Sequence, residues 1–217
     1  MPNYLKWQEK NIIDFSARNI TSLYDDGFIF TRINKGAMNQ TRSLRIDLKK
    51  FLLSSENRRV LKKINSLELT VAPLPYSHYH WSIGKLAKDF YDIKFGEGIF
   101  TANKVKEILT EKEKSNFNKL LTYSLDEKIV GYCIAYANSN FLHYSYPFYN
   151  LSETQSNLGM GMMLQAIMHA QKENKKYIYL GSFQRPTDVY KLQFAGLEWF
   201  DEKKWSKNLE DLKRSLI

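Results

Sequence analysis

The sequence predicts a mixed α/β (α+β) fold, a mixed sheet flanked by helices, and three observations support this prediction. Strand-forming runs alternate with segments of helical periodicity along most of the 217 residues. Three strand-like runs, at residues 120–125, 129–137 and 140–148, follow one another through short polar turns, which indicates an antiparallel meander. After them comes a helix–strand–helix–strand order between residues 158 and 200. The hydrophobic share of 43% is typical of a chain that buries one sizeable core or two small ones.

Short elements are expected in the first fifty residues. Thr21 or Ser22 can cap a short helix that ends at Gly27, since glycine commonly lies just beyond a helix C-terminus. Residues 28–33 form a β-type run. In residues 42–48 apolar and charged side chains alternate, which predicts a strand with one exposed face.

Ser54 or Ser55 is expected to cap a helix with two opposite faces. At 100° per residue, one face carries only basic side chains, those of Arg58, Arg59, Lys62 and Lys63. The opposite face is apolar and carries Val60, Leu61 and Ile64. Such a helix packs on a core and presents a cationic stripe. A membrane-surface helix would also fit, but its apolar face would be narrow, so we favour nucleic acid as the partner.

A boundary between two modules is predicted near residue 75. Residues 67–72 are predicted to form a strand, and the Pro73-Leu74-Pro75 sequence that follows interrupts regular structure. We therefore expect a small basic module at residues 1–75 and a larger domain at residues 76–217. In the larger domain, residues 76–95 show helical periodicity and Asn103 is expected to cap the next helix.

The net charge of +9 is concentrated in one stretch. Between residues 32 and 65 only Asp47 and Glu56 oppose ten basic residues, so this stretch carries +8 (ten minus two). A localised basic field favours a polyanionic partner, because contacts to phosphate supply salt-dependent affinity. An isolated lysine, in contrast, more often belongs to a solvated surface than to a binding site. Arginine at two of the four positions on the basic helix face suits phosphate, whose geometry the guanidinium group matches.

The composition disfavours several classes of protein. The single cysteine, Cys133, lies in an apolar run, cannot form an intramolecular disulfide and is expected to be a buried small hydrophobe. The four histidines, His78, His80, His143 and His169, are scattered, so we expect no metal site. No run approaches the ~18–20 apolar residues of a membrane span, and the N-terminus lacks a signal-peptide pattern. A cytoplasmic location is therefore expected.

Two separated blocks of the sequence resemble one known family. The C-terminal block contains Tyr179-Leu180-Gly181, Tyr190-Lys191, Phe194 and Leu197-Glu198. The N-terminal block contains Leu23-Tyr24-Asp25-Asp26-Gly27-Phe28, Leu44-Arg45-Ile46-Asp47, Phe51, Ser54 and Arg58-Arg59-Val60-Leu61-Lys62. In this order they resemble motifs of the arginyl-tRNA–protein transferase family, which includes the bacterial aspartate/glutamate leucyltransferases. The resemblance covers most of the chain.

The chain departs from that family's pattern in two places. The turn after Gly181 is two residues shorter, and Ser182-Phe183 stands where the family has an aromatic pair. The family also carries a cysteine cluster in the region that corresponds to residues 36–42, whereas this chain has no cysteine there. Without thiolate ligands, the resemblance implies no metal ion and no iron–sulfur cluster.

The order of elements resembles the Gcn5-related N-acyltransferase fold, in which a glycine-opened helix follows a meander. In that fold the amides at the helix start bind the pyrophosphate of an acyl-CoA. The signature Arg/Gln-x-x-Gly-x-Gly/Ala is imperfect in this chain. Gly159 and Gly161 are present, but Ser156 replaces the Arg or Gln, and Gln155 is one residue out of register. The methionine-rich side of this helix is expected to be core.

The resemblance implies transfer of an aminoacyl group from a charged tRNA to an amine, foremost a protein N-terminus with an acidic residue. The charged tRNA is a co-substrate, and no cofactor is expected. The bond between the amino acid and the tRNA is an ester and is already activated. Catalysis therefore requires only that the amine be oriented toward the ester carbonyl, that hydrogen bonds stabilise the developing oxyanion, and that one group accept a proton. Two alternatives stay open: an N-acetyltransferase that uses acetyl-CoA, and a catalytically idle tRNA-binding relative. The sequence does not indicate the oligomeric state.

The motif and the predicted sheet supply the candidate site residues. The catalytic candidates are Tyr146, Tyr190 and Lys191. The candidates for substrate binding are Arg45, Tyr144, Leu158, Gly159, Tyr179, Gly181 and Arg185. The candidates for tRNA contacts are Arg42, Lys49, Lys50, Arg58, Arg59, Lys62 and Lys63. Lys191, with Arg185 or Arg45, could pair the carboxylate of an acidic acceptor.

Each of these candidates also has a structural explanation, because tyrosines in strands usually pack and lysines often cover apolar surface. Tyr190 and Phe194, four residues apart, are expected to share one packed helical face. Lys191 would then reach the edge of a groove.

Overall fold

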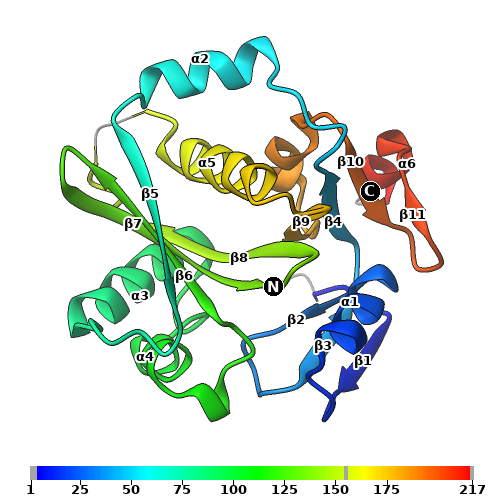
Figure 1. Cartoon of the computed structure of the whole chain (residues 1–217), viewed down its shortest axis with the longest axis horizontal. Coiled ribbons are helices and arrows are strands. Elements are labelled where there is room, and N and C mark those ends of the chain that lie inside the picture. The colour runs from blue at the N-terminus through cyan, green and yellow to red at the C-terminus, as the bar shows by residue number, and fades with distance from the viewer. Residues whose placement is uncertain (1–3, 154–155, 216–217) are drawn as a thin grey trace. The chain divides into compact units, whose positions relative to one another are not determined.

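The computed structural model describes residues 4–153 and 156–215, which divide into two compact units (Figure 1). Within the described residues, unit 1 holds 4–54, 138–143 and 170–215, and unit 2 holds 55–137, 144–153 and 156–169. The units interleave along the sequence, and strand β8 (Phe141–Tyr149) contributes its first residues to unit 1 and the rest to unit 2. The predicted domain division at residue 75 stays a prediction.

Unit 1 contains two groups of paired strands. Strands β1 (Gln8–Asn11), β3 (Ala37–Gln40) and β2 (Phe28–Phe30) form a three-stranded antiparallel sheet in that order. The second group has the order β11-β10-β4-β9-β8. Its further strands are β4 (Ser43–Asp47), β9 (Tyr177–Ser182), β10 (Leu197–Phe200) and β11 (Trp205–Ser206). Pairing is antiparallel except between β8 and β9, where residues 141–143 run parallel to residues 177–179.

The other elements of unit 1 are helical. They are α1 (Ala17–Asp25), the 3-10 helix η2 (Pro186–Gln193) and α6 (Leu209–Arg214). The core of this unit includes Tyr24, Phe28, Leu44, Phe141 and Tyr179, all nearly inaccessible to solvent. The second strand of the predicted C-terminal unit, 197–200, is confirmed, but its second helix is a 3-10 helix.

Unit 2 contains the predicted meander. Strands β5 (Leu67–Pro73), β6 (Lys119–Leu125) and β7 (Lys128–Ala137) pair antiparallel in that order, and β8 follows β7 in the sheet. The helices are α2 (Ser55–Lys63), α3 (Trp81–Phe95), α4 (Ala102–Thr110), the 3-10 helix η1 (Lys112–Lys114) and α5 (Leu158–Lys172), whose last residues belong to unit 1. A mixed α/β fold with a mixed sheet and flanking helices is thus confirmed.

Two helix starts were predicted too late in the sequence. Helix α1 is capped by Ser16, whose hydroxyl accepts the Asn19 N–H at 3.3 Å, so Thr21 and Ser22 lie inside the helix. Helix α4 is capped by Thr101, whose hydroxyl accepts the Lys104 N–H at 3.2 Å, and Asn103 lies in its first turn. In both helices an earlier hydroxyl in extended backbone satisfies a free N–H, which a later residue of the helix cannot do.

Two predictions of exposure were also wrong. Strand β4 is buried on both faces except at Asp47, because β10 and β9 flank it and the charge of Arg45 is paired internally. Tyr190 is 44% exposed, whereas Phe194 is buried. The reason is that η2 is a 3-10 helix with about three residues per turn. Residues four apart therefore do not share a face, and Lys191 is half-buried.

Gly161 of α5 is required by packing within unit 2. A Cβ on Gly161 would overlap the Cδ1 atom of the buried Ile64 side chain. Helix α5 therefore approaches the residues beyond α2 so closely that any side chain at this position would have to displace Cδ1 of Ile64.

We predict that Gly161→Ala lowers the free energy of unfolding by about 1–3 kcal/mol through overpacking. Alanine is otherwise favoured over glycine in a helix by about 1 kcal/mol, so a net loss identifies the clash. The double variant Gly161→Ala/Ile64→Val removes Cδ1 and should be more stable than the sum of the two single losses predicts. Urea unfolding measures all three variants. Strictly additive losses would contradict the packing explanation.

Candidate functional site

Lys191 lies at the end of strand β9 in unit 1. Its Nζ donates a hydrogen bond to the carbonyl oxygen of Ser182 at 3.0 Å. The start of η2 is fixed by Asp188, whose Oδ2 accepts the backbone N–H groups of Gln184 (2.9 Å) and Arg185 (3.1 Å). Burial lowers the pKa of Lys191 and the charge of Arg185 lowers it further, against the opposing effect of Asp188. The chain thus holds an amine that loses its proton more readily than an exposed lysine.

His143, in the unit 1 part of β8, is a buried polar group that sequence reasoning did not select. Its Nδ1 lies 2.8 Å from the hydroxyl of Tyr24, and that hydroxyl accepts the N–H of Phe30 at 3.2 Å. Which of the two side chains donates in the contact between Tyr24 and Nδ1 depends on the tautomer of the imidazole ring. Burial lowers the pKa of His143 to about 3, and the charge of Lys191 lowers it as well. The ring is neutral at physiological pH.

Arg45 is the most extensively paired charge in unit 1. Its Nε contacts Glu198 at 3.0 Å, and its Nη1 contacts Asp25 at 3.1 Å and the Tyr179 hydroxyl at 3.4 Å. The guanidinium carbon also lies 3.9 Å from the centroids of two rings, those of Tyr177 and Trp205. A substrate carboxylate would have to displace one of these partners. The substrate roles predicted for Arg45 and Tyr179 stay predictions.

The remaining candidates in unit 1 differ in accessibility. Gly181 has φ +75°, and no atom lies within 4 Å of the position its Cβ would take. Arg185 is half-buried, and Tyr190 is exposed. Arg42 is buried and its Nη1 donates to the carbonyl oxygen and hydroxyl of Ser215, at 2.7 and 2.8 Å. Burial also lowers the pKa of Arg42.

Two lysines of unit 1 are accessible to a polyanion. Lys49 and Lys50 are both exposed, and Lys50 pairs with Asp47 at 2.7 Å. Because Arg42 is buried in a contact with α6, we expect Lys49 and Lys50 to make the larger contribution to any binding of phosphate by this unit.

In unit 2 the predicted candidates lie mainly in the core. Tyr144 and Leu158 are buried, and Tyr146 is half-buried. The ring of Tyr146 packs edge-on against two phenylalanines, Phe100 and Phe117, each with its centroid 5.4 Å away. A Cβ on Gly159 would lie 3.0 Å from the ring of Tyr149, so this glycine also has a packing explanation. Gln155 lies outside the described residues.

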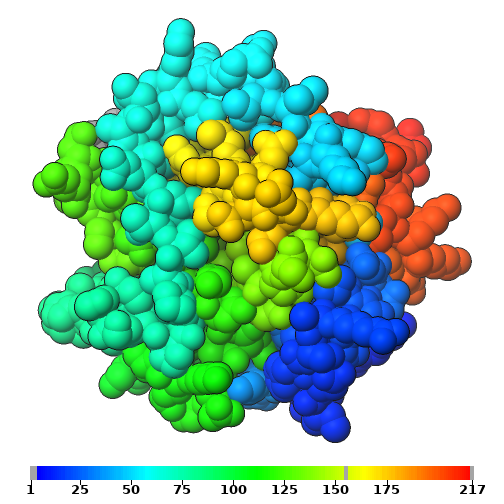
Figure 2. Space-filling model, viewed as in Figure 1, coloured from blue at the N-terminus to red at the C-terminus, as the bar shows by residue number. Residues whose placement is uncertain are grey.

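The predicted two-faced helix is confirmed as α2. All four basic side chains, Arg58, Arg59, Lys62 and Lys63, are exposed, whereas Val60 and Ile64 are buried. Figure 2 shows this helix (cyan) as a ridge on the surface of the molecule. Arg59 also forms an ion pair with Glu56 at 2.8 Å, so part of its charge is already neutralised within the helix.

No group of three or more His, Cys, Asp or Glu side chains in residues 4–153 and 156–215 could hold a metal ion. In the same part of the chain, no helix has both the length and the apolar character needed to cross a membrane.

Comparisons with known proteins agree on one family. The family described as "Arginine-tRNA-protein transferase, C terminus" matches residues 31–201. An aspartate/glutamate leucyltransferase of Pseudoalteromonas atlantica is 24% identical over 175 residues, which cover 78% of this chain and 73% of the relative. An aspartate/glutamate leucyltransferase of Saccharophagus degradans is 24% identical over 166 residues, which cover 75% of this chain and 69% of that relative.

A solved structure supports the fold. It is a GCN5-related glucosamine N-acetyltransferase region of a fungal multi-domain GH3 β-N-acetylglucosaminidase, with a TM-score of 0.50 and 9% identity. The match covers 88% of this chain but only 23% of that protein. At this identity the likeness concerns the fold alone, and it agrees with the acyltransferase-like architecture predicted from the order of elements.

We predict that His143 makes the protein less stable as the pH falls below about 6.5. Its folded pKa lies below its ordinary value, so the unfolded chain binds a proton that the folded chain excludes. Unfolding free energy should therefore drop by about 1 kcal/mol per pH unit from pH 6.5 toward pH 4, from this group alone. His143→Gln keeps a hydrogen-bonding side chain beside Tyr24 and should flatten the slope relative to the unmodified chain. Urea unfolding at several pH values measures the dependence of the unfolding free energy on pH.

The matched control is His78→Gln, at an exposed histidine, which should leave the pH slope as it is. If His143→Gln and His78→Gln gave the same slope as the unmodified chain, the buried ring would not be the source of acid sensitivity.

Proposed function

This chain belongs to the arginine-tRNA-protein transferase family, and from that premise we propose that it transfers an aminoacyl group from charged tRNA to the N-terminal amine of a protein that begins with an acidic residue. The relatives named aspartate/glutamate leucyltransferase support the acidic acceptor and suggest leucine as the group transferred. We place the reaction in the cytoplasm, where charged tRNA is found.

The observation that carries the catalytic part of the proposal is the half-buried amine of Lys191, whose Nζ is held 3.0 Å from the carbonyl oxygen of Ser182. In aminolysis the amine nitrogen attacks the ester carbon, the bond from that carbon to the ribose oxygen of the tRNA breaks, and the ribose oxygen gains a proton. The attacking amine must lose one proton, so a nearby base is needed. Lys191 has a lowered pKa and lies in the Tyr-Lys pair of the family motif. We assign it as the group that accepts this proton.

We predict that Lys191→Ala lowers the rate of transfer to peptides by about a hundredfold, the lower end of the range for a general base. Lys191→Arg should lower the rate by the same factor, because a guanidinium group does not release its proton near neutral pH and so cannot accept one. The loss should be the same for peptides that begin with Asp, Glu or Ala. Transfer of radiolabelled amino acid from charged tRNA to each peptide measures it, with the exposed Lys203→Ala as the control.

A different pattern would assign Lys191 another role. If Lys191→Arg restored transfer and only acidic peptides were affected, Lys191 would pair the acceptor carboxylate. Its contribution would then be that of a charge-assisted contact, roughly ten- to a hundredfold. If tRNA binding fell as well, the substitution would have disturbed β9 rather than the chemistry.

Binding of tRNA is proposed to involve the exposed basic face of α2, together with Lys49 and Lys50. Replacing Arg58, Arg59, Lys62 and Lys63 by Gln should weaken tRNA binding. It should also reduce the slope of log affinity against log salt by about 0.7–0.9 per lost phosphate contact.

Filter binding at several salt concentrations tests this prediction. The control variant is Lys112→Gln/Lys114→Gln on η1, which changes charge in the same unit outside α2. An unchanged salt slope in the α2 variant would remove this helix from the tRNA site.

An acyl-CoA-dependent N-acetyltransferase is the second candidate, favoured by Gly159 and Gly161 at the start of α5. Both glycines face close neighbours in unit 2, and Ser156 interrupts the pyrophosphate signature. We therefore predict no acetyl-CoA binding at micromolar concentrations in a calorimetric titration, and we propose that the enzyme needs no cofactor. Micromolar binding would favour this second candidate. If the chain bound tRNA but transferred no aminoacyl group to any peptide, it would be a catalytically idle tRNA-binding relative of the family.

A further inference from the structure

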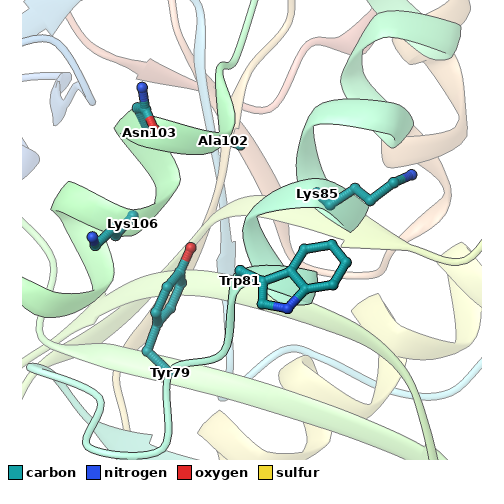
Figure 3. Close-up of a pocket in the computed structure, with 6 residues that line it drawn as sticks. All are labelled: Tyr79, Trp81, Lys85, Ala102, Asn103 and Lys106. Atoms are coloured by element: carbon teal, nitrogen blue, oxygen red, sulfur yellow. The ribbon is translucent and has the colours of Figure 1, made fainter.

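A pocket in unit 2 is not accounted for by the catalytic proposal. It has a volume of about 380 Å³ and lies between the start of α3 and the start of α4 (Figure 3). Its lining residues are Tyr79, Trp81, Lys85, Ala102, Asn103 and Lys106. The volume is at the lower end of the range for small-molecule sites. The lining combines aromatic rings with ammonium groups.

Trp81 supplies an unusually accessible aromatic surface. It is the first residue of α3 and is 65% exposed. The preceding residue, His80, caps α3 and its ring lies 5.4 Å from that of Trp81, which holds the start of the helix in place. Trp is among the side chains most buried on average, so an exposed Trp at the mouth of a pocket offers a flat face for another ring.

Gly84 makes room for the hydroxyl group of Tyr79, one of the residues that line the pocket. A Cβ at this position would lie 2.7 Å from the hydroxyl of Tyr79 and 3.1 Å from the carbonyl oxygen of Ala102. The Tyr79 hydroxyl therefore occupies the space beside Gly84. Figure 3 shows this hydroxyl directed between the two helices, toward Ala102.

The pocket also attracts an anion. The first helical hydrogen bond of α4 runs from Val105 N to Thr101 O, so the N–H groups of Ala102 and Asn103 have no acceptor within the helix. The positive end of the helix dipole adds to their effect. Lys106 is exposed on α4, and Lys85 approaches from α3, where it pairs with Asp89. Two lysine side chains and a helix N-terminus thus line one small space, and in Figure 3 the two ammonium groups point outward from it on opposite sides.

We propose that this pocket binds one unpaired nucleotide of an RNA chain, with the base stacked on Trp81 and a phosphate held by the N-terminus of α4 and Lys106. Stacking on aromatic side chains and contacts to phosphate are the two interactions by which single-stranded nucleic acid is bound. An acidic peptide would use the lysines but would leave the exposed indole face without a partner. The inference rests on the proposed function only in naming the source of the RNA, which is the charged tRNA.

The test uses the full chain and a labelled six-nucleotide RNA, hexaadenylate, followed by fluorescence anisotropy. Trp81→Ala should weaken binding at least tenfold, as expected for the loss of one stacked base, and Trp81→Phe should restore part of it. Lys106→Gln should weaken binding several-fold and reduce the salt slope by about 0.7, the value for one phosphate contact on a single strand. Gly84→Ala should also weaken binding, because it fills the space beside Tyr79.

Matched controls lie on the same helix outside the pocket. Ile93→Ala removes an apolar side chain that is 71% exposed, and Lys94→Gln removes an exposed charge on α3. Neither should alter the affinity for hexaadenylate. Circular dichroism establishes that each variant is folded, which the exposure of Trp81 leads us to expect.

The outcomes separate this inference from the proposed function. Equal affinity of the unmodified chain and Trp81→Ala for hexaadenylate would overturn it. So would displacement of the RNA by hexaglutamate at equal concentration, since that would assign the pocket to an acidic peptide. A chain that transfers no aminoacyl group but binds hexaadenylate through Trp81 supports the pocket and refutes the transfer. An active transferase whose affinity for hexaadenylate does not depend on Trp81 would support the transfer and refute the pocket.

Discussion

The buried guanidinium group of Arg45 is the constraint on which unit 1 depends. It lies on β4 and joins β10 through Glu198, α1 through Asp25 and β9 through Tyr179. Its side chain is only 8% exposed, so its charge has lost most of its hydration. Losing the partner of a buried ion pair costs up to about 3–5 kcal/mol, and Glu198, with its side chain 10% exposed, is the buried carboxylate partner of Arg45. The four elements are therefore held in one arrangement.

This arrangement determines where the proposed proton acceptor lies. Strand β9 pairs with β4 on one side and with the first residues of β8 on the other. Its last residue, Ser182, accepts the hydrogen bond from Lys191. His143, directly opposite Tyr179 in the β8–β9 register, is buried and neutral beside the same lysine charge. The chemistry proposed for Lys191 thus rests on the ion cluster that fixes β9.

The basic residues between positions 32 and 65 differ in how far their charges are available to a partner. Arg42 and Arg45 lie inside unit 1, and Lys50 and Arg59 each pair with a nearby carboxylate. The field available to a polyanion is therefore weaker than the sequence count of +8 implies. The proposed binding of RNA would use two different surfaces of unit 2. The basic face of α2 attracts any phosphate backbone, whereas the pocket at Trp81 requires an unstacked base.

The sequence by itself determined the elements and the family. Alternation and helical periodicity act over a few residues, so the meander, the two-faced helix α2 and the motifs at Tyr179 and Tyr190 could be predicted locally. Tertiary structure decided which charges are buried and which residues turn inward. Arg45 and Glu198 are 153 residues apart, and Tyr24 and His143 are 119 apart, so no local pattern reports their pairing. The choice of a 3-10 helix over an α-helix at η2, which left Tyr190 exposed and Phe194 buried, likewise depends on tertiary packing that local periodicity does not record.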